Sequence, residues 1–293
     1  MSYLLENLVA GTLTGTIYGL IAMGFVLVYK ATGVLNIAHG ALVTLGAFLT
    51  YSLATTAGLP FAVAVPAALV LAFGLGWVTD FLFMRPLIGQ PILAGVMMTF
   101  ALLTIVQGVV IALWGTDYYS YPKVLPERPI RLAGMVLSFE LVGGALVSMA
   151  LMVLLGLFFK TTSSGIQMRA VADDPRAAQA SGISARRISG LAWGMGTVLA
   201  SVGGVILGLI SMVFYGLDAY GLKVLPVVIL GGLESFTGAL VGGILIGVIE
   251  AGAEAYLGVH LKGVKEVAPF VILMVILLLR PHGLFGQHRI ERI

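Results

Sequence analysis

Polar and ionisable residues interrupt the long apolar stretches of this chain at a few positions, and these side chains could do chemistry. Glu250 and Glu254 are four residues apart in one such stretch, so in a helix they share a face. A charge at the centre of a lipid bilayer costs on the order of 2.5–3.5 kcal/mol on insertion scales. Glu254 can reach the outer end of its stretch. Glu250 is expected to make a polar contact within a helical bundle, either a structural hydrogen bond to a neighbouring helix or a contact with a passing solute.

Two further pairs have helical spacing. Asn36 and His39 stand at i and i+3 where an apolar stretch begins, and they form either a helix cap with an interfacial histidine or polar groups on a water-filled path. Thr99 and Gln107 lie on one face of another stretch, where they line such a path or where the threonine bonds only to its own helix. With Glu234 from a glycine-rich turn, the candidate path residues are Asn36, His39, Thr99, Gln107, Glu234 and Glu250.

Glycine-rich breaks occur near 33–40 and 231–243. Broken helices inside a membrane are tolerated only where they line a cavity or are buried in protein. These breaks are the expected flexing points, with Gly33, Gly40, Gly231, Gly232 and Gly238 as candidate hinges.

Several kinds of chemistry are disfavoured. The chain contains no cysteine, and its four histidines are scattered, so neither a metal site nor a nucleophile–base pair has the required spacing. No GxxxxGK motif followed by Ser or Thr is present, so this chain is not expected to hold a nucleotide in that way. The net charge of +3 comes from residues scattered in loops, which does not favour nucleic-acid binding. We therefore expect neither an enzyme nor a cofactor.

The elements that must position these side chains follow from composition. The 293 residues are 59% apolar and 10% charged, and a mean hydropathy of +1.08 leaves too little polar surface for a water-soluble protein of this size. A span needs about 20 apolar residues. We predict one all-α transmembrane domain, 1–293, with about eight to nine crossings at 5–29, 36–56, 60–83, 92–114, 138–159, 188–213, 237–256 and 266–280. The first is expected to be a retained helix, and the piece at 215–230 either crosses as a broken helix or dips in and returns.

Lysines and arginines in short loops predict the orientation, because they are enriched on the cytoplasmic side. If the spans alternate and the 215–230 piece crosses, the N-terminus is external and the C-terminus cytoplasmic. The residues predicted to be cytoplasmic are Lys30, Arg85, Lys160, Arg169, Arg176, Arg186, Arg187, Arg280, Arg289 and Arg292. Those predicted to be external are Lys123, Arg128, Arg131, Lys262 and Lys265, with Lys223 undecided.

Two loops are long enough to have their own structure. The loop at 115–137 lacks a helical apolar stripe and is expected to form a small extracytoplasmic cap. The loop at 161–187 is expected to hold one short cytoplasmic helix, because Pro175 suits a first helical turn after Asp173 or Asp174 and Gly182 suits a stop.

Four segments carry a resemblance to a known family: NIAHG at 36–40, MRAVADDPRAAQASGI at 168–183, VVILGGLESFTGALVGG at 227–243 and RPHGLFG at 280–286. In this order along the chain they resemble the permeases of branched-chain amino acid ABC importers. The resemblance implies that the 161–187 loop is a coupling region for an ATP-binding subunit, through Gly165, Arg169, Asp173, Asp174, Pro175, Arg176 and Gly182. One departure is Ala41, where many relatives carry an acid directly after the His-Gly pair.

The resemblance also implies partners and a location. These are two ATP-binding cassette subunits, a second permease chain, identical or homologous, an extracytoplasmic substrate-binding protein and the lipid bilayer of a bacterial-type cytoplasmic (inner) membrane, without nucleic acid. We expect transport of branched-chain or other hydrophobic amino acids, with urea, short amides or aromatic acids as alternative solutes. A stand-alone secondary carrier, an intramembrane enzyme and an exporter are further alternatives. The carrier would need an ion relay, and ionisable residues within the spans are few.

Overall fold

The computed structural model describes residues 2–123, 129–132, 135–280 and 283–285. Arg128, Arg289 and Arg292, together with part of the RPHGLFG segment, lie outside these ranges.

Six helical segments of the described chain are long and apolar enough to cross a membrane. They contain α1 (Ser2–Thr32), α3 (Phe61–Thr79), α4 (Ile92–Trp114), α5 (Phe139–Thr161), α8 (Ala185–Ile210) and α10 (Phe236–Leu257). After α3 the chain continues through a π-helical turn, Asp80–Met84, and a 3-10 turn, Arg85–Leu87. Each of these segments coincides with a predicted span, so the expected all-α, polytopic membrane architecture is confirmed.

The remaining predicted spans are helical but shorter. Helix α2 (His39–Tyr51) runs on into a π-helical turn, Ser52–Thr56, and helix α11 covers Val264–Leu279. Between α8 and α10 stand a 3-10 turn, η4 (Tyr215–Asp218), and the 13-residue helix α9 (Ala219–Gly231). At 1.5 Å per residue α9 is about 20 Å long, less than the bilayer core.

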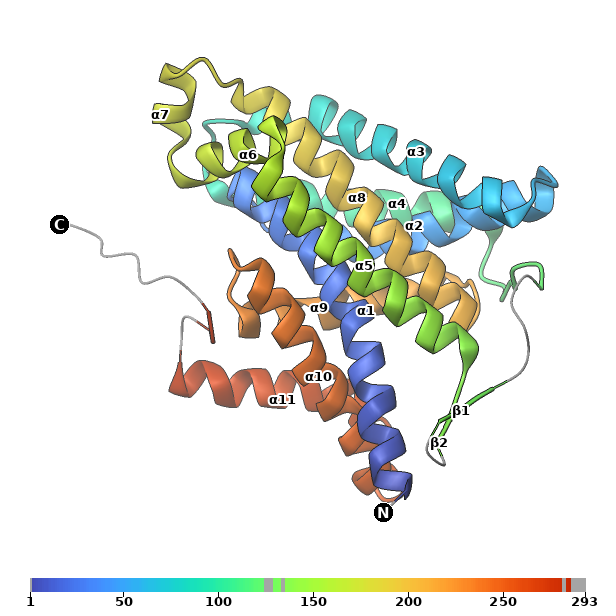
Figure 1. Cartoon of the computed structure of the whole chain (residues 1–293). Coiled ribbons are helices and arrows are strands. Elements are labelled where there is room, and N and C mark those ends of the chain that lie inside the picture. The colour runs from blue at the N-terminus through green and yellow to red at the C-terminus, as the bar shows by residue number, and fades with distance from the viewer. Residues whose placement is uncertain (1, 124–128, 133–134, 281–282, 286–293) are drawn as a thin grey trace.

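Helices α1 and α8 form the centre of the molecule, whereas α3, α4 and α5 expose most of their apolar surface. Figure 1 shows α1 passing through the middle of the bundle. Glycines allow α1 and α10 to touch backbone to backbone: a Cβ added to Gly15 would stand 2.6 Å from the carbonyl oxygen of Gly243. Such contacts replace the hydrophobic driving force that is absent between helices in lipid.

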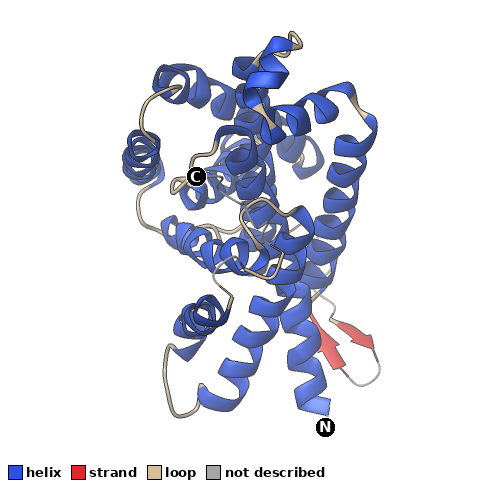
Figure 2. Cartoon of the chain, turned by 90° about the vertical axis from the view of Figure 1, so that its left-hand side faces the viewer, coloured by secondary structure: helices blue, strands red, loops and turns tan. Residues whose placement is uncertain are grey.

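The two long loops lie at different ends of the bundle, as α6 and α7 at the upper left and the strands at the lower right of Figure 1 show. The 161–187 loop contains two helices. Helix α7 (Pro175–Ala180) is the predicted short helix, and α6 (Ser163–Asp173) was not predicted. The 115–137 loop contains an antiparallel hairpin of β1 (Ile130–Leu132) and β2 (Met135–Leu137), with Ile130 opposite Leu137. Figure 2 shows this hairpin near the N-terminal end of the chain.

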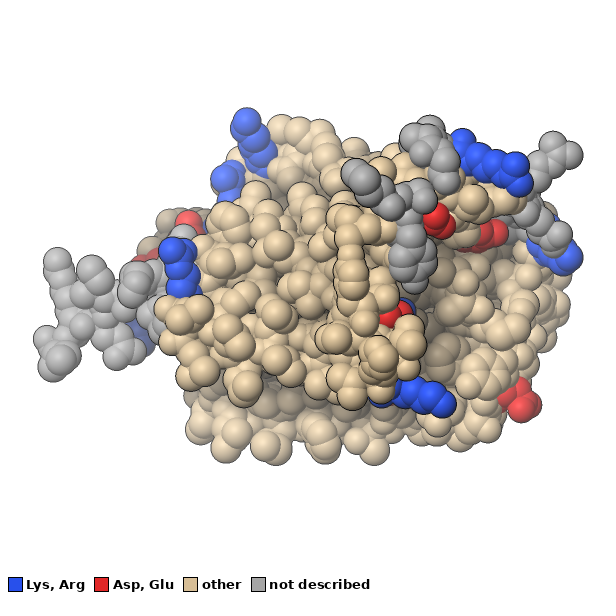
Figure 3. Space-filling view, turned by 90° about the horizontal axis from the view of Figure 1, so that it is seen from below, with Lys and Arg blue, Asp and Glu red and all other residues tan. Residues whose placement is uncertain are grey.

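The surface agrees with an apolar environment. Figure 3 shows one face, on which charged side chains lie mostly near the margins of a broad uncharged area. Exposed apolar side chains are frequent on α3, α4, α5 and α11. A water-soluble monomer rarely presents so continuous an apolar surface.

Candidate functional site

Two of the predicted path residues, Asn36 and His39, lie at the break between α1 and α2. Gly33, with φ of 71°, ends α1, and α2 begins only at His39. Asn36 therefore lies in the turn, where its carbonyl accepts from the backbone N–H of His39 at 3.1 Å. The expectation that both side chains share one helical face is wrong, because the chain is not helical between them. Both residues are 1% exposed.

These two buried side chains are only partly hydrogen-bonded. Nε2 of His39 lies 2.9 Å from the carbonyl oxygen of Ile21. Within the described part of the chain, Nδ1 of His39 and both amide atoms of Asn36 have no hydrogen-bond partner. Buried polar groups normally do, so the break retains unused hydrogen-bonding capacity.

The Thr99 side chain links α4 to the α1–α2 break by hydrogen bonds. Its Oγ1 accepts from the backbone N–H of Ile37 at 3.2 Å and lies 2.9 Å from the carbonyl oxygen of Leu35. It also lies 2.8 Å from the carbonyl of Val96 in its own helix. The contact with Val96 is the bond to its own helix that was expected as one alternative, and the bonds to the break are additional. The lining of a path by Thr99 stays a prediction.

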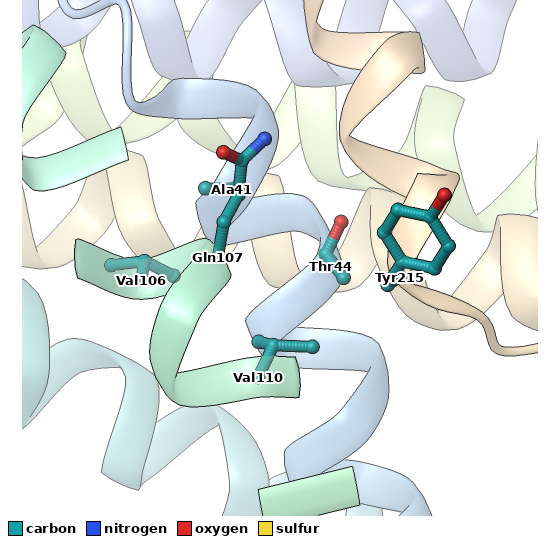
Figure 4. A pocket seen from close by; sticks show the side chains of 6 residues that line it. All are labelled: Ala41, Thr44, Val106, Gln107, Val110 and Tyr215. Carbon is teal, nitrogen blue, oxygen red and sulfur yellow. The ribbon is translucent and has the colours of Figure 1, made fainter. Parts of the chain in front are cut away.

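Gln107 lies two turns further along α4, in a narrow hollow between α2, α4 and η4. The hollow has a volume of about 10 Å³, enough for about one water molecule. Figure 4 shows its lining residues, Ala41, Thr44, Val106, Gln107, Val110 and Tyr215. Nε2 of Gln107 donates to the carboxylate of Asp218, a residue 111 positions away and half-buried.

Glu250 belongs to a buried polar network that joins four helices. Its carboxylate lies 2.7 Å from Nζ of Lys223 on α9 and accepts from the Tyr18 hydroxyl of α1 at 2.8 Å. The same Nζ lies 2.8 Å from Glu266 on α11 and 5.3 Å from the centre of the Tyr220 ring. A structural contact within the bundle, one of the two alternatives for Glu250, is thus present.

The end of the molecule that carries α6 and α7 contains a cavity of about 480 Å³. Its walls come from the end of α1, the turn at 87–91, the α6–α7 segment and the start of α8, and Glu234 contributes from the turn before α10. The cavity falls in the range of small-molecule sites. Of the predicted path residues, Glu234 alone lines it, so the structure does not gather those residues into one site.

The predicted coupling residues are divided between α6 and α7. Asp174 ends α6 and caps α7, since its Oδ1 accepts from the backbone N–H groups of Arg176 and Ala177 at 2.9 and 3.0 Å. Gly182, with φ of 81°, follows α7. Gly165 packs against the backbone of Phe158, where a side chain would clash. The remaining members, Arg169, Asp173, Pro175 and Arg176, are carried on these two helices.

A buried ion pair near this end was missed by sequence reasoning. Asp80, in the π-helical turn after α3, is fully buried and lies 2.7 Å from Nε of Arg85. Ser189, near the start of α8, donates to the same carboxylate. Arg85 also stands over the rings of Trp77 and Phe81. Asp80 lies at the end of an apolar run with an arginine five residues later, which was the available signal.

The opposite end is held together by backbone and side-chain hydrogen bonds of residues 114–121. Tyr119 forms a two-hydrogen-bond bridge with Val213, and the Tyr121 hydroxyl donates to the carbonyl of Ala47 at 3.0 Å. Burial raises the pKa of the Tyr121 phenol, so it stays protonated and able to donate. Nε1 of Trp114 donates to Ser52 at 2.6 Å.

The predicted hinge glycines meet two different requirements. Gly33 and Gly232 have positive φ, which L side chains rarely adopt. Gly40 lies against the backbone of Asp218 and Gly221, and Gly231 and Gly238 lie against each other, so a side chain at any of these three would clash with backbone. Flexing at the five positions stays a prediction.

These features define a class of protein: a polytopic helical membrane protein with a narrow hollow between its helices. One solved structure with a similar fold is PsaBC from Streptococcus pneumoniae in complex with Fab, of which one chain matches with a TM-score of 0.50, 13% identity and coverage of 96% of this chain and 93% of that one. At that identity the likeness concerns the fold alone.

The sequence comparisons are more specific. The model of the family described as branched-chain amino acid transport system / permease component matches residues 7–279. The high-affinity branched-chain amino acid transport system permease protein LivH of Escherichia coli K12 is 27% identical over 99% of this chain and 98% of its own length. Its counterpart BraD of Pseudomonas aeruginosa is 29% identical with the same coverage. The chain therefore belongs to the branched-chain amino acid transport permease family.

Proposed function

We propose that this chain is the membrane-spanning permease subunit of an ABC importer for branched-chain or other hydrophobic amino acids. The family match over residues 7–279 is the observation that carries the proposal. A second permease, identical or homologous, would complete the path. Two ATP-binding subunits would supply energy, and an extracytoplasmic binding protein would deliver the solute. The location would be the cytoplasmic membrane of a bacterial-type cell.

The topology that we propose has nine crossings, an external N-terminus and a cytoplasmic C-terminus. The 480 Å³ cavity supports it, because the α1–α2 break, the α3–α4 turn, the α6–α7 segment and the α9–α10 turn all contribute to its walls. Alternating crossings require these four connections to share one side. In this topology the connections after α2, α4 and α8 share the other side. The bridge between Tyr119 and Val213 and the bond between Trp114 and Ser52 bring these three connections together. Helix α9 would cross together with η4, which directly precedes it.

The translocation path is proposed to follow the face formed by α2, α4 and η4. Gln107 lies seven residues before the end of α4, about 10 Å along the helix, and it is half-buried beside the half-buried Asp218. Polar groups at such depth face a bundle interior or water, and rarely lipid. The second permease chain would cover this face and close the path.

The α6–α7 segment is proposed to dock on the ATP-binding subunits. Two short helices, capped by Asp174 and stopped at Gly182, give a stiffer link than an irregular loop. Helix α8 begins at Ala185, directly after this segment, and runs through the centre of the bundle. A displacement of α7 would therefore reach the core through a continuous helix.

The test is uptake by the full complex reconstituted in proteoliposomes with its ATP-binding partners and binding protein. Arg169→Ala combined with Asp174→Ala should abolish most ATP-dependent uptake of labelled leucine while the amount of inserted protein stays equal. Arg131→Ala in the outer hairpin is the matched control and should transport at the unaltered rate. Unchanged uptake in the double variant would refute the coupling assignment.

The solute is tested separately. A thermal-shift screen of the co-purified binding protein against leucine, isoleucine, valine, urea, short amides and aromatic acids should select the branched-chain amino acids. Uptake that persists without ATP-binding partners and collapses with the proton gradient would instead identify a secondary carrier and overturn the proposal.

A further inference from the structure

We infer that the hollow between α2, α4 and η4 is a contact site for zwitterionic amino acids. In this site Asp218 holds the α-ammonium group, Thr44 and Tyr215 donate to the α-carboxylate, and the apolar wall beside Ala41 contacts the side chain of the solute. The inference rests on the proposed transport function and adds to it the residues that select the solute.

The carboxylate of Asp218 supplies the charge that an ammonium group requires. Within the described chain, its only side-chain hydrogen-bond partner is the neutral amide of Gln107. A carboxylate can accept about four hydrogen bonds, and Asp218 is half-buried, so several acceptor positions stay open to a ligand. Asp218 lies beside the hollow, next to Gln107, and none of the six residues that line the hollow is ionised at neutral pH.

Two hydroxyl groups are available to a solute carboxylate. The Tyr215 side chain is 46% exposed, and its hydroxyl has no hydrogen-bond partner within the described chain. Thr44 lies 3.4 Å from the carbonyl of Gly40, a long and weak contact that a better acceptor would replace. In Figure 4 both hydroxyls and the Gln107 amide are turned to one side, with Val106 and Val110 on the other.

Ala41 limits the size of the site. It is 1% exposed and contributes only a methyl group to the wall. A larger residue would reach toward Gln107, and an acid would put a second negative charge near Asp218. A residue larger than alanine is therefore expected to penalise a bulky solute more than a small one.

The hollow must widen to admit an amino acid, because its present volume of about 10 Å³ holds only about one water molecule. Movement of η4 away from α4 would break one side-chain hydrogen bond, between Gln107 and Asp218. A bound ammonium would replace the lost donor at Asp218. The solute would thus substitute for the contact that its entry disrupts.

The decisive experiment uses the absence of native cysteine. Val106→Cys, a lining position with no proposed polar contact to the solute, is introduced alone, and its labelling by a small water-soluble thiol reagent is timed in the reconstituted complex. Leucine should slow labelling several-fold. The analogue 4-methylpentanoate, which lacks the ammonium group, should not. Combining Val106→Cys with Asp218→Asn should abolish the protection, Asp218→Glu should retain part of it, and Asp117→Asn, an exposed acid outside the hollow, should leave it intact.

Equal protection by leucine and 4-methylpentanoate, or unchanged protection with Asp218→Asn, would overturn the inference. A transport assay without the reporter cysteine tests size: Ala41→Val should reduce uptake of leucine more than uptake of alanine, and an equal effect on both would overturn the role of Ala41. If the unaltered complex shows no leucine uptake dependent on ATP and on the binding protein, the proposed function itself fails. Normal leucine uptake with no effect of Asp218→Asn defeats the site inference alone.

Discussion

Asp218 and Glu250 are both carboxylates that lie between helices of the bundle, and their surroundings are opposite. Glu250 is 2% exposed and contacts the ammonium of Lys223 and the hydroxyl of Tyr18. Asp218 is half-buried and bonds to a neutral amide. A charge whose partners are all supplied by the protein holds helices together. A charge with incomplete partners keeps its capacity to bind a solute.

The difference follows from chain connectivity. Lys223 stands five residues after Asp218. Asp218 directly precedes α9, whereas Lys223, the cation of the buried network, lies within α9. The network joins α9 to α1, α10 and α11, while the pocket joins η4 to α4. We therefore expect changes in the network to affect stability and changes in the pocket to affect transport.

The largest effect is expected for Lys223→Met. This change leaves Glu250 buried without its cation, and breaking a buried ion pair costs about 3–5 kcal/mol. The measurement is thermal or denaturant unfolding of the purified protein in nanodiscs. Lys265→Met, an exposed lysine on α11, is the control and should alter the free energy of unfolding by less than about 0.5 kcal/mol. Equal effects of the two changes would show that the network does not stabilise the fold.

The second variant removes the carboxylate charge that Lys223→Met leaves without its cation. Glu250→Gln added to Lys223→Met removes both members of the pair, and replacing a whole buried pair by neutral groups is often close to neutral. The double variant should therefore unfold at a higher temperature than Lys223→Met alone. A double variant less stable than Lys223→Met would mean that the two side chains are not energetically coupled.

Tyr18→Phe should have a smaller effect, because it removes one hydrogen bond and keeps the ring. A hydrogen bond to a charged group contributes about 1.5–3 kcal/mol. Tyr220→Phe is the matched control, since its ring lies in the same cluster but its hydroxyl has no hydrogen bond within the described chain. The same unfolding assay measures both, and a loss with Tyr220→Phe as large as with Tyr18→Phe would contradict the assignment.

Local patterns in the sequence were enough to predict the long helices and the start of α7. Apolar runs of about 20 residues mark the spans, and Pro175 after an acid, with Gly182 beyond, marks the short helix correctly. Glu250 was expected to make a polar contact in the bundle because an isolated charge in an apolar run needs one, and that expectation is confirmed. Each of these signals lies within one segment.

The partners of these residues could not be predicted, because they come from distant segments. Asp218 and Lys223 both lie in the short piece at 215–230, and nothing local indicates that one meets Gln107 and the other Glu250 and Glu266. The prediction for Asn36 and His39 failed for a related reason: helical spacing was assumed across residues that form a turn.

The smallest change in stability is expected for Asp218→Asn. Asparagine can still accept from Gln107 through its carbonyl oxygen, and the site is half-exposed, so the free energy of unfolding should shift by no more than about 0.5 kcal/mol. Glu250→Gln, the same chemical change at the buried site, leaves the buried Lys223 with only the exposed Glu266 as its ionised partner and should cost more. Both variants are measured in the same nanodisc unfolding assay. If Asp218→Asn destabilises the protein as much as Glu250→Gln does, then Asp218 is a structural residue like Glu250, and the pocket loses its charged ligand group.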